Sequence, residues 1–213
     1  MSAHCQQHHH DHAREGGRLP AGYRRVLWIA LLVNTAMFGI EIMAGLDSGS
    51  VSLLADAIDF FGDAANYALT LAVLSLGLVW RARAALLKAA SMMAFGVLVL
   101  CKVAWSMSQG VQPEPITMGL VGALALTSNL GVAALLYAFR SGDANMRGVW
   151  LCTRNDALGN LAVLAAAAGV FGTHSAWPDL IVAVVMGGLA LSASVSVLRQ
   201  ANAELSTAHP HSH

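Results

Sequence analysis

The chain has 213 residues, of which 56% are hydrophobic and only 11% are charged. A soluble globular domain has about 25% charged residues, so this composition is typical of a protein that lies in lipid. The formal net charge is zero, which argues against a nucleic-acid partner.

Six apolar segments follow one another along the chain, and each is long enough for a helix to cross a hydrocarbon core of about 30 Å. None shows the alternating pattern of a membrane β-barrel strand. The sequence therefore predicts an all-α integral membrane protein with six transmembrane helices. The segments are Val26–Leu46, Val51–Val79, Ala84–Met107, Ile116–Phe139, Val149–Phe171 and Trp177–Leu198.

Basic residues indicate the orientation of these segments. They precede the first segment, flank the second and fourth connections and follow the sixth segment, whereas the first, third and fifth connections carry none. The positive-inside rule then predicts that both termini are cytoplasmic, in agreement with an even number of spans. The polar N-terminus shows no signal peptide. We expect a multi-pass protein of a bacterial-type inner or plasma membrane. The basic residues in these flanking positions are Arg14, Arg18, Arg24, Arg25, Arg81, Arg83, Lys88, Arg140, Arg147 and Arg199.

Two polar tails flank a single membrane domain. Residues 1–23 are rich in His and lack periodicity, so a disordered cytoplasmic tail is expected there. A six-helix membrane domain is expected over residues 24–200, and residues 201–213 are expected to form a short cytoplasmic tail that also contains His. Imidazoles attract metal ions, so the tails either capture metal or are dispensable. The three cysteines lie far apart and predict no disulfide framework. The tail histidines are His4, His8, His9, His10, His12, His209, His211 and His213.

Two pairs of polar side chains lie inside the second and fifth apolar segments, each with a spacing of four residues. Asp59 and Asp63 form the first pair, and Cys152 and Asp156 form the second. A carboxylate in hydrocarbon is costly, which makes it a hypothesis about an ion path. At 1.5 Å per residue, Asp63 lies roughly 20 Å from the outer side and Asp156 roughly 12 Å from the inner side. The two pairs are therefore expected at a similar height.

Three carboxylates and one thiol in a tetrahedral set would suit Zn²⁺ and its relatives, and they disfavour Mg²⁺ and Ca²⁺. Metal would displace protons from such a site, which is the simplest basis for metal–proton exchange. Zn²⁺ is the first expectation, with Co²⁺, Cd²⁺, Ni²⁺, Mn²⁺ or Fe²⁺ as alternatives, and no prosthetic group is expected. In the structural alternative the acids only form buried hydrogen bonds. If Cys152 is an apolar filler, then Asn155, Asn160 or water would complete the shell.

Two further acids are accessory candidates. Glu41 shares a face of the first predicted helix with Asn34 and Phe38, where it would handle protons or form a structural hydrogen bond. Asp56 lies one turn before Asp59, nearer the outside. It would serve an exit path or play a structural role.

At these motifs the chain resembles a known family. The stretch Ser52-Leu-Leu-Ala-Asp56-Ala-Ile-Asp59-Phe-Phe-Gly-Asp63 is similar to the second-helix signature of the cation diffusion facilitators, and Trp150-Leu-Cys152-Thr-Arg-Asn155-Asp156-Ala-Leu-Gly-Asn160 is similar to their fifth-helix signature. The 112–115 turn and the six-helix layout are similar too, so the resemblance runs from about residue 24 to residue 200. It implies divalent metal efflux from the cytoplasm by proton antiport, usually by a homodimer, with ligand positions at Asp59, Asp63, Cys152 and Asp156.

Two departures from the family pattern affect these expectations. Zinc-selective members often have His in the motifs, whereas this chain has Asp59 and Cys152 there. The motifs therefore do not determine which metal is transported. Many members carry a C-terminal cytoplasmic domain, and we expect a variant that lacks it, which makes the homodimer less secure. A membrane metal sensor or subunit that transports nothing is the alternative function. An intramembrane hydrolase is disfavoured because Asp59 and Asp63 lie on one helix.

Overall fold

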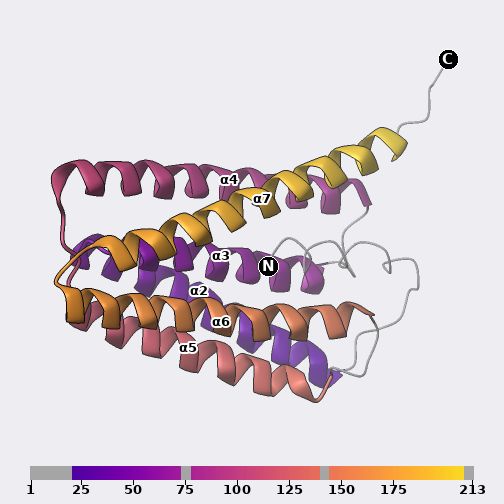
Figure 1. Cartoon of the computed structure of the whole chain (residues 1–213). Helices are drawn as coiled ribbons and strands as arrows, with labels where there is room; N and C mark the ends of the chain where they lie inside the picture. The colour runs from indigo at the N-terminus through magenta and orange to yellow at the C-terminus, as the bar shows by residue number, and fades with distance from the viewer. Residues whose placement is uncertain (1–20, 73–77, 140–143, 209–213) are drawn as a thin grey trace.

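The structure is a computed structural model that describes residues 21–72, 78–139 and 144–208, and the predicted tail histidines lie outside these ranges. Within the described residues the chain forms six helices and no strand, as the apolar segments predict (Figure 1). The helices are α2 (Ala21–Ser48), α3 (Val51–Ala72), α4 (Leu78–Gln109), α5 (Pro115–Tyr137), α6 (Ala144–Thr173) and α7 (Trp177–Ala208).

Some helix ends differ from the sequence prediction. The second segment was predicted to reach Val79, but Leu78 and Val79 belong to α4 and the described part of α3 ends at Ala72. The prediction was wrong because the chain is apolar on both sides of this connection, so composition does not mark the boundary. The helices α4, α6 and α7 also extend beyond their apolar segments, because helix ends that project into water need not be apolar.

The turns at one end of the bundle are bonded to one another. Gly49 joins α2 to α3 with φ 72°, a conformation that glycine adopts without strain. The N–H of Glu114 donates to the carbonyl of Ser48 at 2.9 Å, so the turn before α5 is tied to the turn before α3. The Gln112 side chain donates to the carbonyl of His174 at 2.8 Å, which adds the turn after α6. Three connections thus form one bonded layer at this end.

The helix α3 lies at the centre of the bundle. It packs against α2, α4, α6 and α7, while α4 and α7 form a closely packed pair beside the other helices (Figure 1). Most of α3 is buried, including Asp56, Asp63 and Tyr67. The contact with α2 is close at Gly45, where an added Cβ would lie 2.8 Å from Leu54 Cδ2. The helix that carries the first predicted ligand pair is therefore held on several sides.

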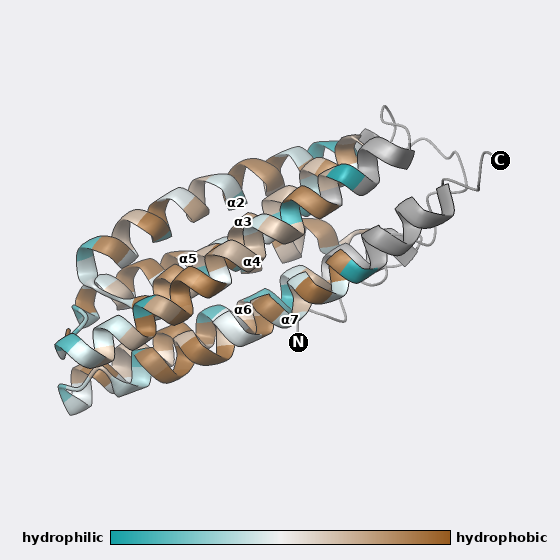
Figure 2. Ribbon diagram, turned by 90° about the horizontal axis from the view of Figure 1, so that it is seen from above, coloured by the Kyte–Doolittle hydropathy of each residue, from teal (hydrophilic) through white to brown (hydrophobic). Residues whose placement is uncertain are grey.

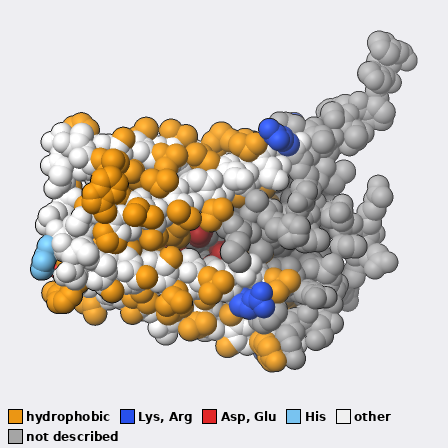
Figure 3. Space-filling model, in the orientation of Figure 1, with side chains coloured by type: hydrophobic (Ala, Val, Ile, Leu, Met, Phe, Trp, Pro, Cys, Tyr) orange, Lys and Arg blue, Asp and Glu red, His pale blue; other side chains and the backbone are white. Residues whose placement is uncertain are grey.

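The outer surface of the bundle is apolar. Figure 2 shows hydrophobic residues along the length of the helices, and Figure 3 shows hydrophobic side chains over most of one face with basic side chains toward one end. Five of the described helices are long and apolar enough to cross a membrane. The helix α3 is the exception, because every stretch long enough to span contains Asp56, Asp59 and Asp63. The chain is a multi-pass integral membrane protein, and three of its acids, Asp56, Asp59 and Asp63, lie on the helix that α2, α4, α6 and α7 cover.

Candidate metal site

The helices α3 and α6 are bonded to each other next to the predicted ligands. Tyr67 Oη and Thr153 Oγ1 share a hydrogen bond of 2.7 Å, and Tyr67 Oη also donates to Asp63 Oδ2 at 3.4 Å. The carboxyl groups of Asp63 and Asp156 are near enough to interact. Because Tyr67 and Thr153 lie one turn from these two acids, this bond fixes the relative height of α3 and α6.

The four predicted ligands do not form a closed set. Asp63 and Cys152 are buried, and Asp59 and Asp156 are partly buried. Asp59 lies near enough to Asp63 for their charges to interact. Among the residues that the structure describes, however, no three His, Cys, Asp or Glu side chains are arranged to hold a metal ion. Anionic side chains repel one another, so a tight tetrahedral set is unfavourable without a cation between its members.

A second pair of acids lies between α2 and α3. Glu41 lies near enough to Asp56 for their carboxyl groups to interact, and both residues are at most 1% exposed. Within the described part of the chain, neither oxygen of Glu41 has a hydrogen-bond partner of good geometry, and the same is true of Asp56 Oδ2. Buried polar atoms without partners are rare and are often explained by water or an ion. The oxygens of this pair that have no partner among the described residues therefore offer ligands to an ion or a water molecule.

The predicted accessory amides have different surroundings. Asn160 is fully buried, and neither polar atom of its side chain has a partner among the described residues. Asn155 is only partly buried. Near this level, Asp56 Oδ1 lies 4.0 Å from the position that a Cβ would take on Gly159. The helices α3 and α6 thus approach each other at the level of Asp56 as well as at that of Asp63.

The N-terminal end of α3 is capped by a residue from another helix. Asp179, in the first turn of α7, accepts hydrogen bonds from Val51 N at 2.8 Å, Ser52 N at 3.0 Å and Ser50 Oγ at 2.7 Å. Ser50 Oγ in turn accepts from Leu53 N at 3.2 Å. The first three free N–H groups of α3 therefore all have acceptors. Asp179 also lies in the first turn of α7, where a carboxylate interacts favourably with the dipole of its own helix.

Sequence reasoning missed three residues beside the site. Tyr67 and Thr153 form the bond between α3 and α6, and Lys88 is buried with its Nζ donating to Asn66 Oδ1. Lys88 was counted only as a charge flanking the second connection, and the structure places it in the third turn of α4, which begins at Leu78. The four-residue spacing between Asp63 and Tyr67 was the available signal for the tyrosine.

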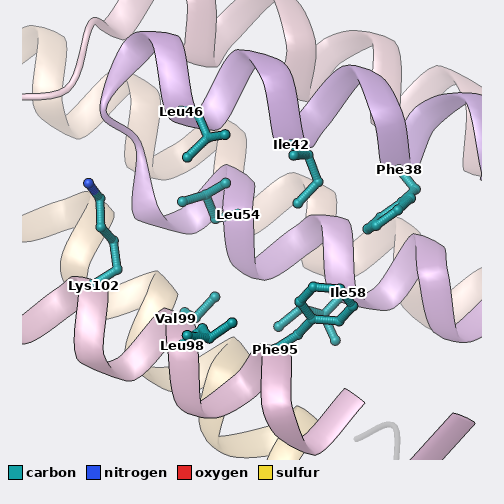
Figure 4. A pocket seen from close by; sticks show the side chains of 9 residues that line it. All are labelled: Phe38, Ile42, Leu46, Leu54, Ile58, Phe95, Leu98, Val99 and Lys102. Carbon is teal, nitrogen blue, oxygen red and sulfur yellow. The ribbon is translucent and has the colours of Figure 1, made fainter. Parts of the chain in front are cut away.

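A groove between α2, α3 and α4 is a different kind of feature. It has a volume of about 250 Å³, and Figure 4 shows its lining, which is apolar except for Lys102 at one end. No acid lines it, so it has no ligands for a cation. The lining residues are Phe38, Ile42, Leu46, Leu54, Ile58, Phe95, Leu98, Val99 and Lys102.

Comparisons with known proteins match most of the chain. The cation efflux transmembrane domain matches residues 27–206. The chain is 27% identical over 192 residues to the metal cation efflux system protein CzcD of Cupriavidus metallidurans, and the match covers 84% of this chain and 58% of that protein. It is 28% identical over 214 residues to the zinc transporter ZitB of Pectobacterium atrosepticum, covering 93% of this chain and 64% of the relative.

The chain thus spans about six-tenths of the length of the curated relatives that it matches. The match includes all six described helices and both predicted ligand motifs. It confirms the resemblance that those motifs predict. The chain belongs to the cation diffusion facilitator family, and it carries the transmembrane domain of that family.

Proposed function

We propose that this chain exports divalent transition-metal ions from the cytoplasm in exchange for protons, through a site formed by Asp59, Asp63, Cys152 and Asp156. The hydrogen bond between Tyr67 and Thr153 supports the proposal most, because it joins α3 to α6 one turn from an acid on each helix. Two ligand pairs on neighbouring helices at one depth are what a cation site within a membrane requires.

The chemistry of the donors supports a metal–proton exchange. Carboxylates and a thiol bind metal only when they are deprotonated, so binding a metal ion releases protons. Three oxygens and one sulfur suit tetrahedral Zn²⁺, and a thiolate disfavours Mg²⁺ and Ca²⁺. One relative is named a zinc transporter, which favours Zn²⁺ as the first substrate. Co²⁺, Cd²⁺, Ni²⁺, Mn²⁺ and Fe²⁺ are the other proposed cargo.

The buried polar atoms nearer the outer end support a path for ions. Glu41, Asp56 and Asn160 carry side-chain atoms without partners among the described residues, and we assign them to the passage between the metal site and the outer side. The transporter then alternates between inward-open and outward-open states. Metal and protons must differ in their affinity for these two states, since otherwise neither would drive the change. We also propose that two copies of the chain act as a homodimer.

Flux measurements test the exchange. The purified chain is reconstituted in liposomes with an acidic interior, and Zn²⁺ uptake is followed together with the internal pH. The expected result is uptake coupled to proton release, reduced roughly 100-fold or more in Asp63→Asn, as expected for the loss of a metal ligand. Asp47→Asn removes an exposed carboxylate at the outer end and is the matched control. Absence of uptake by the wild type, with insertion verified, would overturn the proposal.

Metal selectivity tests the role of the thiol. Cys152→Ser replaces sulfur by a harder oxygen donor, so Cd²⁺ and Zn²⁺ uptake should fall more than Mn²⁺ uptake. An unchanged order of metal uptake would exclude Cys152 as a ligand, and Asn155 or Asn160 would then be the proposed fourth ligand. Tight metal binding without any flux would instead assign the chain to the metal sensors or transporter subunits.

A further inference from the structure

Lys88 is a buried cation beside the proposed metal site. Its side chain is 7% exposed, and its Nζ donates to Asn66 Oδ1 across the interface between α4 and α3. Asn66 lies one turn from Asp63 on the same helix. The lysine charge is near enough to act on both Asp63 and Cys152, which are two of the four proposed ligands. An ionisable side chain within a membrane protein marks a functional position by default.

We infer that Lys88 is an affinity-determining residue of the metal site, whose fixed positive charge competes with the transported cation for Asp63 and Cys152. This inference rests on the proposed function. The ammonium group offsets part of the negative charge of the ligands when no metal is bound. It repels a divalent ion when that ion arrives. Lys88 therefore weakens metal binding and speeds release, which suits a transporter that must let its cargo go.

A purely structural role for Lys88 makes a different prediction. In that case the lysine only links α4 to α3 through Asn66, and its replacement lowers stability without tightening metal binding. Lys88→Gln separates the two roles because glutamine can still donate a hydrogen bond but carries no charge. Lys88→Arg keeps the charge and should retain the wild-type affinity. Lys102→Gln is the matched control, because Lys102 lies on the same helix but lines the apolar groove (Figure 4).

The experiment measures the binding of Zn²⁺ and Co²⁺ to the full chain in lipid nanodiscs by titration calorimetry. Removing one nearby positive charge should lower the Kd of Lys88→Gln by roughly tenfold or more. Zn²⁺ flux in liposomes should show a lower KM together with a lower kcat, because release becomes slow. Lys88→Arg and Lys102→Gln should both keep the wild-type Kd.

Two outcomes would overturn the inference while leaving the proposed function intact: an unchanged Kd in Lys88→Gln, or a weaker one, when the wild type binds and transports Zn²⁺. Thermal unfolding of each variant shows whether it is folded, and Lys88→Met, which keeps the length of the stem, replaces Lys88→Gln if that variant does not fold. A wild type that neither binds nor transports any of the metals would overturn the proposed function itself.

Discussion

Replacing Asp179 by alanine should destabilise the whole bundle, although this residue lies outside the proposed metal site. Its carboxylate is 1% exposed and accepts three hydrogen bonds at the start of α3, two from backbone N–H groups and one from Ser50. A hydrogen bond to a charged group contributes about 1.5–3 kcal/mol, and a buried N–H left without an acceptor costs about 1–3 kcal/mol. Because the three bonds share one acceptor group, they do not add fully.

We therefore expect Asp179→Ala to lower the free energy of unfolding by about 3–5 kcal/mol. Asp179→Asn keeps one acceptor oxygen and should cost roughly half as much. The assay is equilibrium unfolding of the purified chain in mixed detergent micelles, followed by circular dichroism. Asp47→Ala removes an exposed carboxylate near the same end and should change stability by less than about 0.5 kcal/mol. A loss below about 1 kcal/mol in Asp179→Ala would refute the reasoning, because one ordinary hydrogen bond already contributes that much.

Three further predictions use the same unfolding assay. Tyr67→Phe removes a hydroxyl that bonds α3 to α6, so it should cost about 1–2 kcal/mol, and a change below about 0.5 kcal/mol would contradict the role of that bond. Gly45→Ala should destabilise, because its Cβ would lie 2.8 Å from a side chain of α3, whereas Gly39→Ala has no atom within 4 Å and should be neutral or stabilising; equal effects would contradict the close packing. The pKa of Glu114 is lowered below its ordinary value of 4.5 because the carboxylate accepts hydrogen bonds from Thr117 and caps α5. A lowered pKa stabilises the fold above that ordinary value, and the stabilisation is lost as the pH falls through the folded-state pKa. The acid side of the stability profile should therefore be flatter in Glu114→Gln, and an unchanged profile would exclude the cap as its cause.

The sequence was sufficient to predict the helices and the height of the main acids. Apolar runs predict spans because backbone polar groups must be satisfied within a membrane, and six described helices correspond to the six runs. The rise per residue predicts that Asp63 and Asp156 lie at a similar level, and the bond between Tyr67 and Thr153 joins α3 to α6 one turn from each of them. These successes depend on distances along single helices, which sequence spacing determines directly.

Contacts between helices could not be predicted in the same way. The bond from Asp179 to Val51 spans 128 positions of the chain, and no spacing rule relates them. The position of Lys88 depended on where α4 begins, and the apolar connection hides that boundary. The proximity of Glu41 and Asp56 depends on the rotation of α2 against α3, which close packing at Gly45 helps to determine. Such details arise from side-chain packing between neighbours, and a single sequence does not encode them in a readable pattern.

The hydrogen bonds that join the central helix α3 to the α4–α7 pair differ between its two ends. At the Asp179 end, one carboxylate joins α3 to α7 through three hydrogen bonds, and at the other end the described bond from Lys88 to Asn66 joins α3 to α4. Separating α4 from α3 at the Lys88 end breaks the bond of Lys88 to Asn66. Separating α7 from α3 at the other end breaks the three bonds of Asp179. We therefore expect the α4–α7 pair to separate from α3 more readily at the Lys88 end than at the Asp179 end.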